Sequence, residues 1–290
     1  MRPVTDLLQR LADGAVIVLD GGMGTEIQSR GVPMDGEAWS AIANLTHADV
    51  VRGIHEDYIR AGAEVVIANT YPAGVGALTA AGLADRVAEI NRAAVAHAKE
   101  ARERTGTAGV VVAGSMSHMA VEGLSGAGGT SAADAFRVQA HVLADASVEL
   151  LVLEMMRTEA VAEPALDAAT ETGLPVWFGV SLLDGEDLDR LLELAHGRAD
   201  AVMIMHTDID VAGRALPIVK RAWPGPVGAY PHLGDWTPPN WVFGELSPAA
   251  FAEKVAPWAH AGAQVLGGCC GIGPAHIAAL RNALEHAQAQ

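Results

Sequence analysis

The sequence predicts a single-domain (β/α)8 TIM barrel, and three observations support this fold class. Short apolar runs rich in Val, Ile and Leu recur along the chain, and Ala-rich helical stretches separate them. This alternation is typical of repeated βα units around a parallel sheet, and eight alternations are the number that closes a barrel. No Pro/Ser-rich linker divides the 290 residues, so we expect residues 1–290 to form one domain.

The predicted elements follow one another in the order of such a barrel. The strands are the apolar runs 15–19, 64–68, 109–113, 150–153, 175–180, 201–205, 226–229 and 263–266. The helices are the stretches 48–61, 83–104, 131–147, 159–171, 187–195, 211–222, 247–259 and 274–287. Ser131 and Ser247 are capping residues at the starts of two helices, and Pro274 suits a first helical turn.

Three loops are longer than a connection between a strand and a helix needs. They are 27–47, 118–130 and 231–246, and each follows the carboxyl end of a predicted strand. In a (β/α)8 barrel, loops at that end build the active site. We therefore expect all three loops to overhang the catalytic end of the barrel.

Composition and charge exclude several classes of partner. The chain has 19 Lys and Arg against 35 Asp and Glu, a net charge of -16, which repels nucleic acid and anionic lipid. No apolar run approaches the roughly 18 residues of a membrane span. We expect a cytoplasmic protein without nucleic-acid or membrane partners. The Ala-rich outer helices carry no clear interface stripe and leave a homo-oligomer open.

Polar residues recur where the predicted strands end. They are Asp20, Asn69, Thr70, Tyr71, Ser115, Glu154, Ser181, His206, Tyr230, Cys269 and Cys270. Because the carboxyl ends of barrel strands face one space, these side chains are expected to meet there. Taken singly, each is equally well explained as a partner for loop backbone.

Residues 267–271 read Gly-Gly-Cys-Cys-Gly and predict a zinc site. The flanking glycines free the backbone to bring both sulfurs to one centre, and thiolates suit zinc. Cys269 and Cys270 are neighbours, so an ordinary unstrained disulfide between them is excluded. A catalytic zinc normally has three protein ligands, and His206 is the best third donor, with His232 as a fourth that substrate displaces. The alternatives are buried cysteines, a hydrogen-bonding His206 and a His232 that packs in its loop.

Asp20 and Glu154 are carboxylates at the mouth of the predicted barrel. They are suited either to general acid and base work or to gripping a substrate ammonium group. With a thiolate metal centre nearby, gripping is the more economical role. Backbone N–H groups at Gly21, Gly22 and Gly24 are suited to hold a carboxylate, so the two features together describe an amino acid substrate.

The chain resembles the homocysteine S-methyltransferases. The matching stretches, in family order, are Asp20-Gly-Gly-Met-Gly-Thr-Glu26, Trp39-Ser40, His55-Glu-Asp-Tyr58, Ala61-Gly-Ala-Glu64, Asn69-Thr-Tyr71, Ala113-Gly-Ser115, Glu154, Tyr230-Pro231 and Gly267-Gly-Cys-Cys-Gly271. The resemblance implies a zinc-bound thiolate that attacks an activated methyl group to give methionine. It also implies that Asp20 and Glu154 hold the homocysteine amino group while Gly21 and Gly22 face its carboxylate. We add Thr70, Tyr71 and Ser115 to the expected substrate-binding residues.

Two positions depart from the family pattern. The family usually has Asn-Cys-Thr where this chain has Met205-His206-Thr207, and Tyr-Pro-Asn where it has Tyr230-Pro231-His232. Neutral imidazole in place of thiolate removes one negative charge from the zinc shell, which leaves the substrate sulfur less electron-rich. Our hypothesis is that His206 keeps zinc in place and suits a more activated sulfonium donor. The alternative is loss of zinc together with the ancestral reaction.

The methyl donor and two competing functions stay open at this point. Since one domain is predicted, we expect a free donor such as S-methylmethionine, S-adenosylmethionine or a betaine. Trp39, Tyr71, Trp236 and Trp241 are suited to cation-π contact with it or to ordinary lid packing. A barrel zinc hydrolase would need several His and Asp ligands rather than two cysteines, and a non-catalytic thiol or metal binder is the third alternative.

Overall fold

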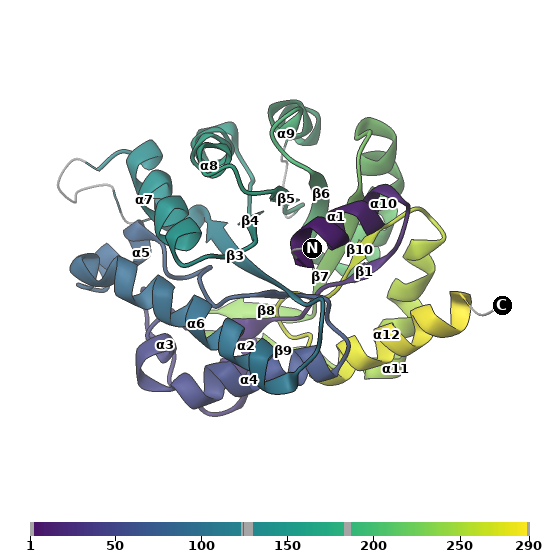
Figure 1. Cartoon of the computed structure of the whole chain (residues 1–290), viewed down its shortest axis with the longest axis horizontal. Helices are drawn as coiled ribbons and strands as arrows, with labels where there is room; N and C mark the ends of the chain where they lie inside the picture. Colours follow the sequence, from purple (N-terminus) through teal and green to yellow (C-terminus); the bar gives the residue numbers. More distant parts are fainter. Residues whose placement is uncertain (1–2, 123, 125–129, 183–186, 289–290) are drawn as a thin grey trace.

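The computed structural model describes residues 3–122, 124, 130–182 and 187–288. Within these residues, eight parallel strands form one sheet in the order β1-β10-β7-β6-β5-β4-β3-β2 (Figure 1). The strands are β1 Ile17–Val18, β2 Val65–Ile67, β3 Val111–Ser117, β4 Leu150–Glu154, β5 Val176–Val180, β6 Ala201–Asp208, β7 Val227–His232 and β10 Val265–Leu266. A parallel bridge from Leu19 to Val65 closes the sheet. The predicted (β/α)8 barrel is confirmed.

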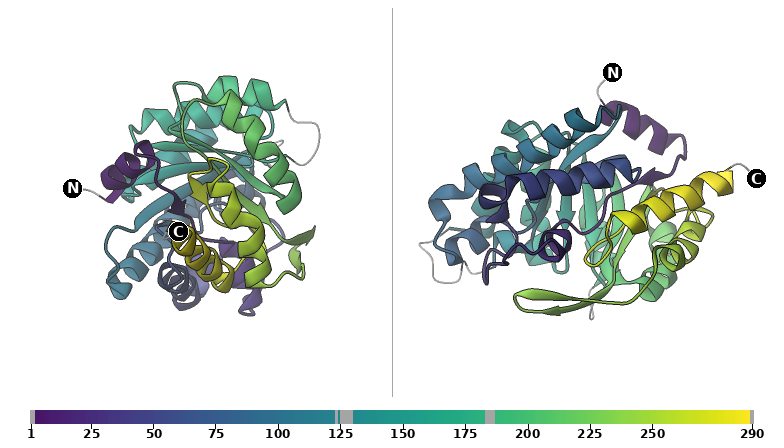
Figure 2. Two further views of the ribbon diagram at one scale, coloured as in Figure 1. Left: turned by 90° about the vertical axis from the view of Figure 1, so that its right-hand side faces the viewer. Right: turned by 90° about the horizontal axis from the view of Figure 1, so that it is seen from below.

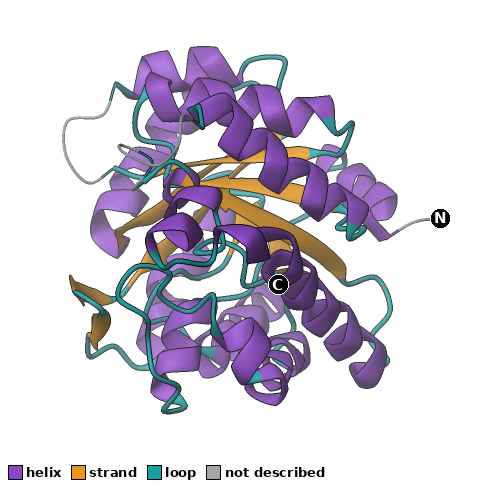
Figure 3. Ribbon diagram, turned by 90° about the vertical axis from the view of Figure 1, so that its left-hand side faces the viewer, coloured by secondary structure: helices purple, strands orange, loops and turns teal. Residues whose placement is uncertain are grey.

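Helices surround the strands, as Figures 2 and 3 show. The helices that alternate with the strands are α4 Ala48–Arg60, α6 Val87–Thr105, α7 Ala132–Asp145, α8 Glu159–Glu171, α9 Leu188–Ala195, α10 Ile209–Ala222, α11 Pro248–Val255 and α12 Pro274–Gln288. Ser131 and Ser247 cap α7 and α11 as expected, since each hydroxyl accepts a backbone N–H of the first turn. In the described part of the chain, no helix combines the length and apolar character that a membrane crossing needs.

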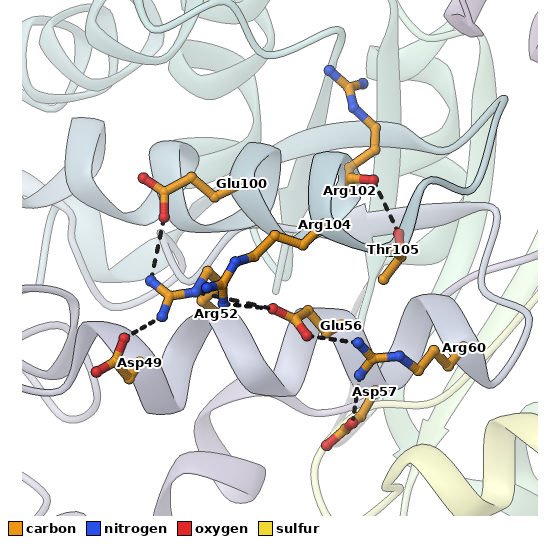
Figure 4. Close-up of polar contacts among 9 residues, drawn as sticks. All are labelled: Asp49, Arg52, Glu56, Asp57, Arg60, Glu100, Arg102, Arg104 and Thr105. Carbon is orange, nitrogen blue, oxygen red and sulfur yellow. Dashed lines mark hydrogen bonds and ion pairs between the residues drawn. The ribbon is translucent and has the colours of Figure 1, made fainter.

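Alternation along the strands separates two apolar layers. Val111 and Ala113 of β3 point into the barrel, whereas Val112 packs on the surrounding helices. All residues of β3, β4 and β5 are buried, which explains why the runs read as continuously apolar. Ion pairs between α4 and α6, such as Arg52 with Glu100, add polar contacts on the outer surface (Figure 4).

Helix α1 Pro3–Ala12 closes the amino-terminal end of the barrel, which we did not predict. Its buried Val4, Leu7 and Leu11 join the cluster of side chains inside the barrel. The Leu11 carbonyl accepts a hydrogen bond from Gln264, directly before β10. Within the described residues, the interior is therefore filled at this end of the barrel.

The long loops carry secondary structure of their own. The first contains the end of α2 Met23–Ser29 and α3 Ala43–Thr46, and the third contains the antiparallel hairpin of β8 Gly234–Thr237 and β9 Asn240–Phe243. Short helix α5 Val75–Ala80 also follows β2. The second loop begins as the 3-10 turn η2 His118–Ala120, and residues 123 and 125–129 of that predicted loop lie outside the described residues.

Four strands run further than predicted, and β4 does so by one residue, to Glu154. β3 continues to Ser117, β6 to Asp208 and β7 to His232. Ser115 is therefore inside a strand rather than beyond its end, which corrects the expected position. His206 likewise lies within β6, at a register shift between Met205 and Asp208. Most of the added residues are polar, so hydropathy alone ends these strands too early.

Candidate active site

A cavity of about 520 Å³ opens at the carboxyl ends of the strands. The exits of β1, β2, β4, β6, β7 and β10 contribute lining residues, and the first and third loops supply Trp39, Trp236 and Trp241. Figure 3 shows the β8–β9 hairpin and the N-terminus at opposite sides of the molecule. Both loops thus lie over the open end of the barrel.

His206, Cys269 and Cys270 meet at the wall of this cavity. The Sγ of Cys269 is 3.5 Å from Nδ1 of His206 and 3.9 Å from Sγ of Cys270. One donor atom from each residue lies within 4.8 Å of the others, and these three form the candidate metal group among the described residues. One imidazole and two thiols match the three protein ligands that a catalytic zinc uses.

The exit of β10 is shaped by close backbone approaches. A Cβ on Gly268 would lie 2.2 Å from Cγ2 of Ile272, and one on Gly271 would lie 2.0 Å from the Leu233 carbonyl oxygen. Gly271 also has a φ of +79°, which side chains disfavour. The Cys269 N–H donates to the Pro231 carbonyl at 2.8 Å. Only glycine on both sides allows this segment to turn both sulfurs toward the cavity.

The exit of β6 instead holds a side chain in a strained backbone. His206 has a φ of +43°, in the left-handed region, at the register shift of β6. Its carbonyl accepts the Ser181 hydroxyl at 3.2 Å. The Thr207 hydroxyl donates to Met205 O and accepts the Leu182 N–H. These bonds fix a conformation that turns the imidazole from the strand toward the cysteines.

The three donors depend on one another electrostatically. Hydrogen bonding with Cys270 and then burial raise the pKa of the Cys269 thiol well above its ordinary value. Burial lowers the pKa of His206, but the hydrogen bond and negative charge of Cys269, together with Glu154, outweigh it and leave that pKa raised. Since the group resists carrying several negative charges without a cation, the donor set fits a bound metal ion.

His232 lies beside the group rather than in it. Its ring centroid is 4.6 Å from that of His206 and 5.7 Å from that of Trp241. The described residues that line the cavity do not include His232. Its expected role as a displaceable fourth ligand stays a prediction, and its observed contact is ring packing against His206.

Asp20 and Glu154 are buried carboxylates in the wall of the same cavity. Asp20 Oδ2 accepts the Ile67 N–H at 2.7 Å, and Glu154 accepts hydroxyl bonds from Ser115 and Tyr230. Burial raises the pKa of both, and the charge of Glu154 further raises that of Asp20. Two buried carboxylates with raised pKa values are stabilised by a cation placed near them.

Several predicted binding residues have different contacts from those expected. Thr70 and Ser115 are fully buried and are not among the described residues that line the cavity. The Thr70 hydroxyl donates to Ser115 O and accepts the Ser115 N–H, which fixes the strand that carries the hydroxyl on Glu154. Gly21 and Gly22 do line the cavity, but the Gly22 N–H donates to Ile272 O. The expected free donor at Gly22 is therefore wrong.

Aromatic side chains from two loops form the rim. Trp39 packs edge-on against Trp236 at 5.7 Å and against Tyr71 at 6.4 Å between ring centroids. Gln28 clamps the hairpin, because its side-chain amide both donates to and accepts from the backbone of Trp241. The four predicted rim aromatics all line the cavity.

Two residues that line the cavity, His118 and Glu122, were not predicted, and Tyr230 was expected at the barrel mouth without a role. Tyr230 binds Glu154, and His118 and Glu122 line the cavity after β3. His118 is the first residue of the second long loop, and Glu122 follows it by four positions. A histidine directly after a strand, followed four residues later by a carboxylate, is the sequence pattern that could have identified these two residues.

Comparisons with known proteins identify the family of the chain. Residues 17–284 match the family described as Homocysteine S-methyltransferase. Homocysteine S-methyltransferase from Escherichia coli is 30% identical over 92% of this chain and 94% of its own, and homocysteine S-methyltransferase 4 from Zea mays is 28% identical over 95% and 91%. The metallated form of the homocysteine methyltransferase MmuM from Escherichia coli superposes with a TM-score of 0.77 at 27% identity, covering 97% of this chain and 99% of that one. The chain belongs to the homocysteine S-methyltransferase family.

Proposed function

We propose that this enzyme uses zinc, held by His206, Cys269 and Cys270, to transfer a methyl group from a small sulfonium donor to homocysteine, giving methionine. The observation that carries the proposal is the convergence of these three donor atoms within 4.8 Å in the cavity wall. When bound, zinc lowers the pKa of a coordinated thiol and holds it as a nucleophilic thiolate at neutral pH.

The remaining residues orient the amino acid. Asp20 and Glu154 accept the ammonium group, because each is buried with a raised pKa that a neighbouring cation would relieve. Ser115 and Tyr230 position Glu154 through their hydroxyl groups. Gly21 faces the carboxylate of the substrate. Trp39 and Trp236 pack edge-on at the rim, between the cavity and solvent.

The donor is expected to be cationic. Trp39, Tyr71 and Trp236 present rings at the rim, where a sulfonium gains cation-π attraction. The described lining residues include Asp20, Glu154 and further carboxylates but neither Lys nor Arg. A neutral imidazole at His206 makes the bound sulfur less electron-rich than a third thiolate would, which favours S-methylmethionine or S-adenosylmethionine over a betaine.

One relative bears on the identity of the methyl acceptor. A relative from Astragalus bisulcatus, 26% identical over 98% of this chain and 96% of its own, is a selenocysteine methyltransferase. The assay therefore offers both homocysteine and selenocysteine. A cytoplasmic location and a role in methionine biosynthesis remain predictions that this reaction would explain.

Metal analysis followed by an activity assay tests the proposal. The purified protein should hold about one zinc per chain and form methionine from homocysteine with a sulfonium donor. His206→Ala should lose the metal on dialysis and lose activity, whereas His206→Cys should keep both, because thiolate is also a zinc ligand. His141→Ala, an exposed substitution on α7, is the matched control. Full zinc retention in His206→Ala, or full activity of zinc-free protein, would contradict the assignment.

A barrel hydrolase and a non-catalytic binder give different results in the same assay. A hydrolase would consume an ester or amide without a methyl donor, and a binder would retain zinc and thiol without forming product. Only the methyltransferase yields a methylated acceptor in equal amount to the demethylated donor.

A further inference from the structure

Tyr71, His118 and Glu122 contact one another in series along one side of the cavity. The Tyr71 hydroxyl lies 3.5 Å from Nδ1 of His118, and Nε2 of His118 lies 3.3 Å from Oε2 of Glu122. The Tyr71 and His118 rings pack edge to face at 5.9 Å. All three residues line the same cavity as Cys269 and Cys270. The series therefore begins at the site.

The order of the contacts determines how His118 can carry a proton. A carboxylate at Nε2 favours the tautomer with its hydrogen on that nitrogen, which leaves Nδ1 as an acceptor facing the Tyr71 hydroxyl. Burial lowers the pKa of His118, Glu122 raises it, and Arg157 and His206 lower it, with a net decrease. The ring is thus neutral before it accepts a proton.

The outer end of the series of Tyr71, His118 and Glu122 is exposed to solvent. The side chain of His118 is 31% exposed and that of Glu122 is 65% exposed. A proton that reaches Glu122 is therefore in contact with water.

The backbone around the series is held by packing. The Ser117 hydroxyl donates to Tyr71 O at 2.7 Å and accepts the Met119 N–H, so β2 and the turn after β3 move together. A Cβ on Gly76 of α5 would lie 2.1 Å from the Glu122 carbonyl oxygen. Such a close approach places Glu122 on a firm support rather than on a free loop.

The reaction under the proposed function releases one proton in each turnover. The thiol S–H bond breaks and its electron pair forms the new bond to the methyl carbon. The bond between that carbon and the donor sulfur breaks, and its pair stays on the donor sulfur. No group in this exchange keeps the thiol proton. Asp20 and Glu154 are engaged with the substrate ammonium, so another route must take the proton from the cavity.

We propose that Tyr71, His118 and Glu122 form a relay that carries the thiol proton of the acceptor to solvent. The thiol proton passes to the Tyr71 oxygen as the phenolic proton passes to Nδ1 of His118. The Nε2 proton of His118 then passes through Glu122 to water, which leaves His118 as the Nδ1–H tautomer. Proton exchange with water at the partly exposed ring returns the hydrogen to Nε2 before the next turnover. This inference rests on the proposed function, because it needs a thiol acceptor in the cavity.

The relay is tested with His118→Ala, with His141→Ala as the matched control. We expect His118→Ala to lower kcat about 100-fold, the scale of a lost proton-transfer group, while bound zinc and the KM for homocysteine stay near those of the unsubstituted enzyme. Free imidazole in the buffer should restore part of kcat, and the solvent deuterium isotope effect should rise. Tyr71→Phe should behave similarly, and Glu122→Gln should have a smaller effect because water can replace it.

Each outcome separates the relay from the proposed function. Unchanged kcat in zinc-loaded His118→Ala would overturn the relay alone. Lost activity without imidazole rescue and with an unchanged isotope effect would indicate a structural role and would also overturn it. If the unsubstituted enzyme methylates no thiol with any donor, the proposed function fails and the relay fails with it.

Discussion

The exits of β6 and β10 bring the side chains of the candidate metal group to one point by different physical means. At β10, glycines allow a backbone approach that has no room for a Cβ, as at Gly271. At β6, His206 occupies the left-handed region itself and is held there by hydrogen bonds from its surroundings. The backbone after β10 is therefore fixed by close packing around its glycines. The backbone of His206 is strained, and hydrogen bonds offset the cost of that strain. We therefore expect the glycines that follow β10 to tolerate no substitution, whereas position 206 in β6 should tolerate a change of ligand.

The largest expected effect is at the β10 exit. Gly271→Ala combines a disfavoured φ with a clash against a backbone oxygen, and we expect it to lower the free energy of unfolding by about 3 kcal/mol and to abolish zinc binding. Urea unfolding and metal analysis measure both effects. Gly14→Ala is the matched control, since Gly14 has a φ of +86° but nothing within 4 Å of its Cβ position. An equal loss in both variants would mean that φ alone matters.

The strain at β6 is measured by a pair of variants at His206. Both His206→Ala and His206→Gly remove the ligand, but only glycine relieves the left-handed backbone. In metal-free protein we expect His206→Gly to exceed His206→Ala in free energy of unfolding by about 1.5 kcal/mol. Chemical denaturation in the presence of a chelator gives the difference. Equal stabilities would show that His206 is not strained in solution.

The polar contacts that hold His206 are expected to contribute less. Ser181→Ala removes the hydroxyl bond to the His206 carbonyl, so the free backbone relaxes away from the ligating conformation. We expect zinc affinity to fall about fivefold, equivalent to one ordinary hydrogen bond. Competition with a zinc chelator measures it. Ser181→Thr, which keeps the hydroxyl, should retain the affinity, and equal losses in both variants would argue for a packing effect instead.

The smallest expected effect is the contribution of His55 to the pH dependence of folding stability, which has to be known before the stabilities of variants at the two exits are compared. His55 of α4 is fully buried, and burial lowers its pKa from the ordinary 6.5 to about 3. Below pH 6.5 the unfolded chain binds a proton that the folded chain does not, so stability falls as pH falls. We expect a loss of about 0.7 kcal/mol between pH 7 and pH 6 from this residue. His55→Leu should remove that part of the slope, and exposed His141→Leu should not.

The barrel could be predicted because its strands are buried on both faces. Runs such as Leu150 to Leu153 read as continuously apolar, and the eight of them lie where the strands are. Helix α1 and the β8–β9 hairpin were missed because neither belongs to the βα alternation. Their amphipathic patterns are short, and only the tertiary packing of Leu7 or Trp241 gives them a place.

The convergence of His206, Cys269 and Cys270 was predictable from residue type, whereas the backbone support of His206 was not. Two cysteines between glycines are a strong local signal, and His206 followed from its position after an apolar run. Nothing in the sequence reports a backbone φ or the Ser181 bond that stabilises it. Thr70 and Ser115 lie within family-like stretches, yet their hydroxyls bind protein groups. Residue identity predicts which chemistry is present, but not which partner each group already has.

Among the described residues, helix α1 fills one end of the barrel, and the cavity opens at the other. Both substrates and both products are expected to pass through the mouth beneath Trp39 and Trp236, since Leu7 and its neighbours fill the far end. The amino acid, whose sulfur has to reach the cysteines in the wall, should load before the methyl donor closes the path behind it. We therefore expect an ordered kinetic sequence in which the donor binds second. This order follows from the 10 residues of α1, which fill the end of the barrel away from the site.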